Sequence, residues 1–194
     1  RVLMEKAYVV AVGGGRVAHL EVSREVARRF HRFYGEIFPE PQPLLTHFPR
    51  LPGLDNRKMS KSYGNTIDLS DDAVAVTKKV MRMYTDPKRV RADIPGTVEG
   101  NPVFIYHDAF NPDIAQVDDL KARYRAGTVG DVEVKRTLAD AINATLDPMR
   151  ARRADILAKP ERIKEILIDG SSRARVIAQE TMREVRDAVK LNYT

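Results

Sequence analysis

Cysteine is absent from the 194 residues of this chain. The sequence therefore excludes disulfide bonds, thiolate metal sites and cysteine nucleophiles. It also lacks any stretch near the roughly 18 uninterrupted apolar residues that a membrane-spanning helix needs. The apolar run Tyr8–Val12 is short and ends in glycines, so it does not resemble a secretory signal. We expect a cytoplasmic protein with no membrane partner.

Positive charge is concentrated in the last part of the chain. Residues 1–120 hold 17 Lys and Arg against 16 Asp and Glu, whereas residues 121–194 hold 16 against 11. A basic C-terminal segment fits a polyanionic partner such as nucleic acid. A solvated helical surface rich in arginine would carry the same charge, so composition leaves both interpretations open.

The first third of the sequence has the pattern of an α/β protein. Residues 8–12 are typical of a buried strand, and they stop at Gly13-Gly14-Gly15. A helical pattern runs over 17–34 and ends at Gly35. Strand, glycine turn and helix form half of a βαβ unit, which predicts a parallel sheet.

The rest of the chain reads as loops and helices. The proline-rich stretch 39–49 cannot be a helix interior, and a polar loop over 52–65 follows it. We call this second segment the lysine–serine loop. Helices are expected at about 71–84, from Pro102 over 103–106, at 114–126, over the pattern 132–149 and at 171–191. The sequence thus predicts an α/β domain over 1–68 and an all-helical domain over 69–194.

Several residues mark where these helices should begin, end or bend. Asp71 and Asp72 suit a first turn, and Asn101 before Pro102 suits a cap followed by proline at the first helical position. Gly127 should stop one helix, Asp131 is a candidate cap for the next, and Pro148 should kink or break it. The last helix is expected to bury one apolar face: Ala174, Ile177, Ala178, Thr181, Val185 and Ala188.

The glycine turn has three possible meanings. Gly13-Gly14-Gly15-Arg16-Val17-Ala18 satisfies the minimal dinucleotide fingerprint, in which backbone amides and a helix N-terminus hold a pyrophosphate. The acidic residue expected about 20 positions later, at the end of a second strand, is absent. A plain structural turn, or a nucleotide-facing turn of another α/β enzyme, would show the same glycines.

The string Lys58-Met59-Ser60-Lys61-Ser62 suits a polyphosphate ligand. Two ammonium groups three positions apart can approach one polyphosphate from one side, and the serines add hydroxyl donors. If ATP is attacked at its α-phosphorus, the departing pyrophosphate gains charge. A cation already in place then lowers the barrier by about 3 kcal/mol. The alternative is a solvated surface loop that happens to hold two lysines.

This string is identical to the K-M-S-K-S signature of class I aminoacyl-tRNA synthetases, and its surroundings resemble the bacterial tryptophanyl-tRNA synthetases. The resemblance extends over residues 51–57, 63–67, 85–87, 101–107 and 120–127. It implies the second half of a Rossmann-like nucleotide-binding domain, then a helical anticodon-binding domain. The implied reaction uses tryptophan, ATP with Mg²⁺ and tRNA(Trp), and the family enzyme is typically a homodimer.

The resemblance also implies roles for individual residues. Lys58 and Lys61 match the lysines that hold the departing phosphates. Three further sets of positions match family contacts to ATP. They are Met59, Ser60 and Ser62 in the loop, Leu51 at the adenine, and Gly13, Gly14 and Gly15 in the glycine turn. Arg150, Arg152 and Arg153 are candidate tRNA contacts, although a surface role explains them as well.

Two departures from the family pattern limit what we expect of the chain alone. The family's V-G-x-D-Q turn reads Val12 to Arg16 here, with Gly15 and Arg16 in place of the acid and the amide. The family's HIGH-type histidine motif, which must oppose the signature lysines, is missing, as in a fragment. We therefore expect that the isolated chain does not form the adenylate.

Two alternative functions follow from the residues. A non-catalytic tRNA-binding protein derived from the family is favoured by Gly15 and Arg16, and a nucleotide-binding oxidoreductase rests on the glycine triplet alone. The four histidines, His19, His31, His47 and His107, lack metal-ligand spacing and are expected to be surface or packing residues. We predict no metal site formed by the protein's own residues.

Overall fold

A computed structural model describes residues 1–46, 48 and 50–191. Its contacts divide the chain into two compact units. The terminal unit combines Arg1–Arg50 with Lys159–Thr194, and the central unit is Leu51–Ala158. These units are defined by packing. The division predicted from the sequence, an α/β domain over 1–68 and an all-helical domain over 69–194, concerns function and not packing. It stays a prediction.

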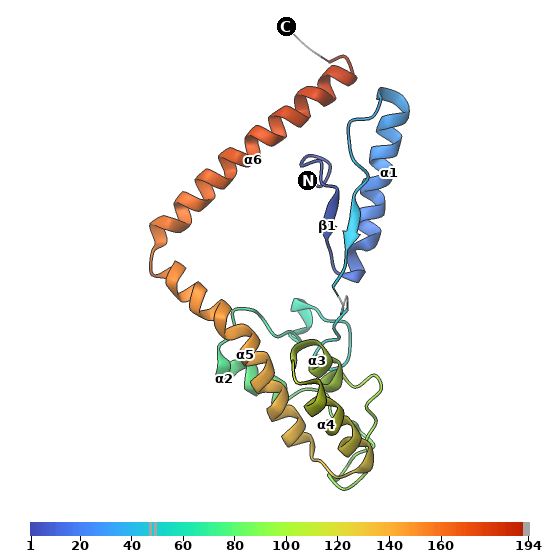
Figure 1. Ribbon diagram of the computed structural model, residues 1–194, viewed down its shortest axis with the longest axis vertical. Helices are drawn as coiled ribbons and strands as arrows, with labels where there is room; N and C mark the ends of the chain where they lie inside the picture. Colours follow the sequence, from blue (N-terminus) through green and yellow to red (C-terminus); the bar gives the residue numbers. More distant parts are fainter. Residues whose placement is uncertain (47, 49, 192–194) are drawn as a thin grey trace. The chain divides into compact units, whose positions relative to one another are not determined.

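The terminal unit contains a βαβ arrangement. Strand β1 (Val9–Ala11) leads through a 3-10 turn at Gly14–Arg16 into helix α1 (Val17–Tyr34), and strand β2 (Gln42–Leu44) follows. The strands are parallel, with Val9 opposite Gln42 and Ala11 opposite Leu44, and α1 lies beside them (Figure 1). The predicted strand, glycine turn, helix and parallel pairing are therefore confirmed, and the chain is an α/β protein.

Two features of this sheet differ from the prediction. Strand β2 lies within the proline-rich stretch that the sequence suggested was only a connection. It accommodates Pro43 because a two-stranded sheet has only edge strands, where a missing N–H costs little. The predicted burial of the first strand is also wrong, since the Val9 side chain is 58% exposed. Among the described residues the sheet has two strands, so each is paired along one edge alone.

Helix α6 (Pro160–Ala188) begins well before the predicted residue 171. Pro160 occupies the first turn, where its missing N–H costs nothing, and Gly170 lies inside the helix. The predicted buried face is largely wrong, because Thr181 is buried whereas the Ile177 side chain is 48% exposed. Thr181 Oγ1 donates to Met4 O at 2.8 Å, and Lys6 pairs with Glu184, so the N-terminal segment docks on this helix.

The central unit is helical. Its helices are α2 (Ala73–Met81), α3 (Pro102–Phe110), α4 (Ile114–Ala126) and α5 (Asp131–Leu157) (Figure 1). Asp72 caps α2 by accepting from Ala75 N, Asn101 caps α3 by accepting from Val103 N, and Gly127 ends α4 in the left-handed conformation. The sequence predicted these boundaries to within a few residues. Pro148 lies inside α5, which continues to Leu157, so the predicted break is absent.

One apolar core holds these four helices together. Phe104 of α3 and Tyr124 of α4 meet edge to face with centroids 4.9 Å apart, and the Arg89 guanidinium lies 4.1 Å from the Tyr124 ring centroid. The buried cluster comprises Leu54, Val76, Val80, Met83, Val98, Val103, Phe104, Tyr106, Leu120, Tyr124, Val129, Val134, Leu138, Ala139, Ile142 and Leu146.

Asp131 was predicted to cap helix α5, but its carboxylate instead accepts hydrogen bonds from two core side chains. The cap position is Gly130, and Asp131 accepts from Arg89 Nη1 at 3.1 Å and from Tyr124 OH at 3.0 Å. Arg89, whose side chain is fully buried, also donates to the carbonyls of Ile94, Ala92 and Val129. A buried charge needs such a complete set of partners. The loop between α2 and α3 is thereby fixed to the core.

Candidate functional site

The base of the lysine–serine loop is fixed to the central unit by backbone contacts. Pro52 and Lys58 face each other in an antiparallel bridge, and Gly53 N donates to Arg57 O at 2.7 Å. The phenol of Tyr106, which belongs to the core, donates to Pro52 O at 2.8 Å. Tyr84 N donates to Leu54 O at 2.7 Å. Leu51 and Met59 pack against the apolar core, so the loop starts from a rigid support.

A single buried amide links the two sides of this loop. Asn65 is 5% exposed, and its Nδ2 donates to Asp55 Oδ1 at 2.8 Å and to Lys58 O at 3.1 Å. Its Oδ1 accepts from Ser60 N at 2.8 Å. In the sequence Asn65 follows Gly64, and this pair is typical of a sharp backbone turn. No local pattern identifies its partners, because they lie five to ten residues away.

The Asp55 carboxylate is ionised at neutral pH. The hydrogen bond from Asn65, joined by those from Arg57, lowers the pKa of Asp55 to about 2 against an opposing effect of burial. Arg57 contributes its backbone N at 3.1 Å and its Nε at 2.7 Å. The loop therefore carries one fixed negative charge at its base.

The two signature lysines are exposed, and Lys58 and Lys61 have no ion-pair partner among the residues that the structure describes. Ser60 Oγ and Ser62 Oγ are 2.7 Å apart, so one hydroxyl donates to the other. A short 3-10 turn at Lys61–Tyr63 follows, and it ends at Gly64, whose φ of +63° is the left-handed conformation that glycine adopts readily. The loop thus presents two free cations and two hydroxyls to solvent.

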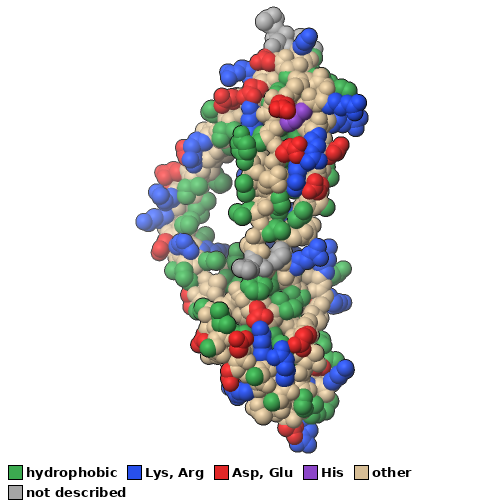
Figure 2. Space-filling model, turned by 45° about the vertical axis from the view of Figure 1, so that its right-hand side comes forward, with side chains coloured by type: hydrophobic (Ala, Val, Ile, Leu, Met, Phe, Trp, Pro, Cys, Tyr) green, Lys and Arg blue, Asp and Glu red, His purple; other side chains and the backbone are tan. Residues whose placement is uncertain are grey.

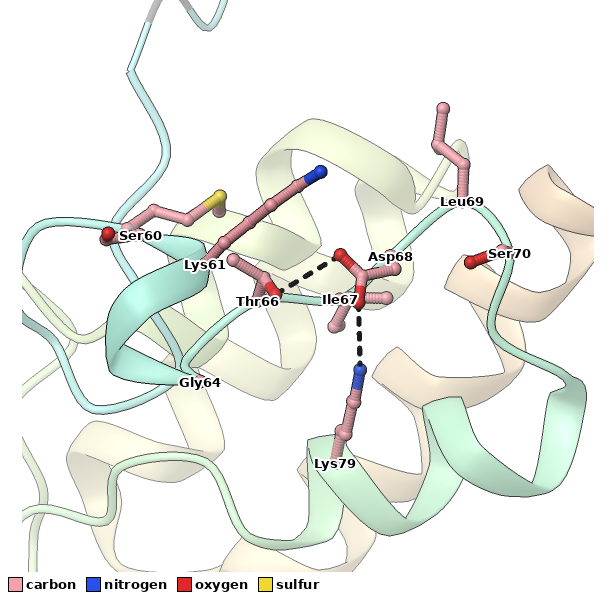
Figure 3. Close-up of a pocket in the computed structure, with 10 residues that line it drawn as sticks. Ser60, Lys61, Gly64, Thr66, Ile67, Asp68, Leu69, Ser70 and Lys79 are labelled. Carbon is pink, nitrogen blue, oxygen red and sulfur yellow. Dashed lines mark hydrogen bonds and ion pairs between the residues drawn. The ribbon is translucent and has the colours of Figure 1, made fainter.

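A cavity of about 870 Å³ adjoins the second half of the loop. Its lining residues are Met59, Ser60, Lys61, Gly64, Thr66, Ile67, Asp68, Leu69, Ser70 and Lys79. In Figure 3 the Lys61 side chain extends from the loop, while Lys79 rises from α2 on the other side of Asp68. Lys58 is not among the lining residues, so the structure brings one of the two lysines to this cavity.

Acidic partners neutralise Lys79 in this cavity. Its Nζ lies 2.6 Å from Asp71 Oδ2. Figure 3 shows its second partner, Asp68, whose Oδ2 lies 3.7 Å from Nζ and whose Oδ1 accepts from Thr66 Oγ1 at 3.3 Å. Burial alone would raise the pKa of Asp71, but the hydrogen bonds from Lys79 and the Asp68 backbone outweigh it and hold that pKa below its ordinary value. Lys61 is thus the unpaired cation of the cavity within the described residues.

The predicted nucleotide turn belongs to the terminal unit. Gly13, Gly14 and Gly15 connect β1 to α1, and Arg16 N donates to Gly13 O at 2.8 Å. Apart from Gly15 itself and the chain next to it, no atom of the described residues lies within 4 Å of the position that a Cβ on Gly15 would occupy. Packing therefore does not require this glycine, and Arg16 beside it is exposed.

The three candidate arginines of α5 differ in their contacts. Arg150 Nε donates to Asp71 O at 2.9 Å, and its other nitrogens bond Asp147 and Asn143, so this side chain joins α5 to the start of α2. Arg152 is exposed and donates to Pro148 O at 3.2 Å, and Arg153 is exposed as well. A role of all three in tRNA binding stays a prediction.

The histidines occupy different environments. His107 is buried, its Nε2–H donates to Val134 O at 3.0 Å, and burial lowers its pKa. His31 Nε2 accepts from Phe38 N, His19 is exposed, and His47 lies outside the described residues. No group of three or more His, Cys, Asp or Glu in the described chain could hold a metal ion. The described helices also include none long and apolar enough to span a membrane.

Comparison with known proteins gives a consistent result. The model of a family described as tRNA synthetases class I (W and Y) matches residues 2–147, which include both the glycine turn and the lysine–serine loop. A tryptophan–tRNA ligase of Treponema pallidum is 53% identical over 192 residues, and one of Chlamydia caviae is 48% identical. Each match covers 98% of this chain but only 57% and 56% of the relative, so the chain spans little more than half the length of these curated relatives.

Solved structures agree with the sequence matches. A tryptophanyl-tRNA synthetase of Campylobacter jejuni, complexed with ADP and tryptophan, matches with a TM-score of 0.74 and 30% identity. The match covers 97% of this chain and 59% of that one. A tryptophanyl-tRNA synthetase of Mycoplasma pneumoniae has a TM-score of 0.76 at 21% identity, over 98% of this chain and 58% of that one, and shows likeness of fold.

Proposed function

Because the chain belongs to the class I tRNA synthetases of the tryptophan and tyrosine group, we propose that it is the part of a tryptophan–tRNA ligase that carries the signature loop. The proposed whole enzyme joins tryptophan to ATP, releases pyrophosphate and transfers the aminoacyl group to tRNA(Trp). The chain would contribute the second half of a Rossmann-like domain and a helical anticodon-binding domain. We propose that the whole enzyme is cytoplasmic and acts as a homodimer.

The observation that supports this function most strongly is a pair of unpaired lysines on a loop with a rigid base. In the proposed reaction the tryptophan carboxylate attacks the α-phosphorus of ATP, and the bond to the bridging oxygen of pyrophosphate breaks. Negative charge then grows on the leaving group. Lys58 and Lys61 lie in reach of solvent and are free to approach those oxygens, where each cation would be worth about 3 kcal/mol in the transition state.

The other residues predicted to contact ATP keep those roles in this proposal. Ser60 and Ser62 offer hydroxyl donors, Met59 lies beside them in the loop, and Leu51 would touch the adenine. Gly13, Gly14 and Gly15 would bring backbone amides to the phosphates. ATP would be used together with Mg²⁺, which would screen the negative charge of the phosphates.

A fusion enzyme tests the proposal directly. The chain is joined to the portion of the Treponema pallidum relative that it does not cover, and exchange of labelled pyrophosphate into ATP is measured with tryptophan present. Lys58→Ala and Lys61→Ala should each lower the exchange rate by about 100-fold. Lys78→Ala, which removes an exposed lysine of α2, is the matched control and should leave the rate unchanged. The chain without its fusion partner should give no exchange.

An undiminished rate in both loop variants would refute the proposed role of the lysines. Exchange by the isolated chain would show that the opposing histidine motif is unnecessary. A fusion that binds tRNA in a salt-dependent way but never exchanges pyrophosphate would favour the second candidate, a non-catalytic tRNA-binding protein. Gly15 and Arg16 support that candidate, since they replace an acid and an amide with a glycine and a cation beside the proposed nucleotide.

A further inference from the structure

The Asn65 amide is the one side chain, within the described loop, that bonds three separated points of it. Asp55 precedes the signature string, Lys58 begins it and Ser60 is its third residue. The Asn65 side chain bonds all three, through the carboxylate, a backbone carbonyl and a backbone N–H. Asn65 O also accepts from Leu54 N at 3.0 Å. The residue therefore ties the outgoing arm of the loop to the incoming arm.

The chemistry of these contacts demands a carboxamide. Both N–H hydrogens of the amide face acceptors, and its oxygen faces a donor, so each polar atom of the side chain has a partner. An aspartate would turn a second carboxylate toward Asp55 and toward the Lys58 carbonyl. A shorter or apolar side chain would leave the Ser60 N–H and the Lys58 carbonyl without these partners, which is costly at a buried site.

The Asn65 amide packs directly against the backbone of Gly53. A Cβ placed on Gly53 would collide with Nδ2 and Cγ of Asn65, and it would also crowd Asp55 Oδ1. The backbone of the incoming arm can lie this close to the amide only because the residue is glycine. Two positions far apart in the loop thus depend on one another.

The tip of the loop is held differently. Lys61, Ser62, Tyr63 and Gly64 are exposed, and the Asn65 side chain bonds none of them. We propose that Asn65 is a positioning residue, which fixes the backbone at Lys58 and Ser60 while the Lys61–Gly64 tip stays free to follow a departing phosphate. The catalytic consequence rests on the proposed function, whereas the fixing of the loop does not.

Limited trypsin digestion of the full chain tests the fixing of the loop. Cleavage of the Lys58–Met59 and Lys61–Ser62 bonds is followed by mass spectrometry, with the exposed Arg91–Ala92 bond as internal reference. In Asn65→Ala the Lys58–Met59 bond should be cut about tenfold faster relative to the reference, as expected when a buried hydrogen-bond set is lost locally. The Lys61–Ser62 bond lies in the tip, which Asn65 does not hold, so its cleavage should change much less. Gly53→Ala, which displaces the same amide from the other side, should give the same pattern.

Asn101→Ala is the matched control. Asn101 is also buried in the central unit, and its side chain makes two hydrogen bonds, accepting from Val103 N and donating to Thr97 O, far along the chain from the loop. This variant should not raise the ratio of Lys58–Met59 cleavage to reference cleavage. If Asn65→Ala and Gly53→Ala leave that ratio as in the wild type, or if Asn101→Ala raises it equally, Asn65 does not fix the loop and the proposal is wrong.

The fusion enzyme then separates this proposal from the proposed function. Asn65→Ala should lower kcat for pyrophosphate exchange about tenfold while the KM for tryptophan stays unchanged, because a looser loop spends less time in the productive position. If Lys58→Ala and Lys61→Ala are inactive but Asn65→Ala is fully active, the positioning role fails and the function stands. If the lysine variants are fully active, the function fails, and the digestion result still decides whether Asn65 fixes the loop.

Discussion

The central and terminal units differ sharply in how they bury apolar side chains. The central unit encloses a sixteen-residue cluster drawn from all four of its helices and from the lysine–serine loop. The terminal unit, among its described residues, fully buries Leu20, Ala27, Pro41 and Thr181. Both units contain long helices, so helix content alone does not make a core.

The helices of the terminal unit also expose many apolar side chains. On α1 the side chains of Val22, Val26 and Phe33 are 65%, 52% and 63% exposed. On α6, Ile166 and Leu167 are 53% and 64% exposed. Figure 2 shows apolar side chains, in green, gathered along one side of this long helix and charged side chains along the other. Contiguous exposed apolar surface is typical of surfaces that bind other chains or segments. The lysine–serine loop thus belongs to the unit with the larger buried core, whereas the glycine turn belongs to the unit that leaves more of its apolar helix side chains exposed.

The largest expected effect is the independent folding of one unit. Residues 51–158 expressed alone should unfold cooperatively in urea and give dispersed amide signals in NMR spectra, because the whole buried cluster is retained. Residues 1–50 alone should give neither, since the two short strands and α1 bury few side chains. A cooperative transition for residues 1–50, or none for 51–158, would overturn the comparison.

Two phenylalanines probe the same difference inside the intact chain. Phe104 is 1% exposed and packs on Tyr124, so Phe104→Ala should lower the free energy of unfolding of the central unit by about 3–5 kcal/mol. Phe33 of α1 is 63% exposed, and Phe33→Ala should cost at most about 0.5 kcal/mol. Urea titration followed by hydrogen exchange of α3 and α1 amides measures both, and equal losses would contradict the assignment of the core.

Local signals explain what the sequence predicted well. Asn101 followed by Pro102, Gly127 after a helical run and Gly13 to Gly15 after a strand each act within a few residues. Capping and left-handed turns depend on side chains next to the backbone that they serve, so a sequence reveals them. The string Lys58–Ser62 was informative for a similar reason, because it is a compact set of cations and hydroxyls.

Distant partners explain what the sequence predicted badly. Asp131 was read as a cap, but its carboxylate serves Arg89, 42 residues earlier. Lys79 lines the cavity and Asn65 orders the loop, yet neither stands out locally, since their partners are fixed only by the fold. The face of α6 was predicted from period alone. Periodicity gives the apolar side of a helix but does not reveal whether anything covers it.

The smallest expected effect concerns pH and is confined to the central unit. Burial lowers the pKa of His107 below its ordinary value of 6.5, against weaker opposing effects of Val134 O and Asp108. The unfolded chain therefore binds a proton near pH 6.5 while the folded chain does not. Stability should fall as pH drops below about 6.5 and level off below the lowered pKa, with a slope of at most about 1.4 kcal/mol per pH unit.

The geometry around His107 explains why protonation is unfavourable. Val134 O can only accept, so Nε2 carries the hydrogen, and Nδ1 is left to accept from Asn111 Nδ2 at 3.4 Å. A proton on Nδ1 would face that donor in a buried site. Urea unfolding of residues 51–158 between pH 7 and 5 measures the slope, and His107→Gln should flatten it while lowering stability at every pH. If the unfolding free energy of His107→Gln falls with pH as steeply as that of the wild type, another group takes up the proton. The pH dependence of the central unit would then not arise from His107 in its core.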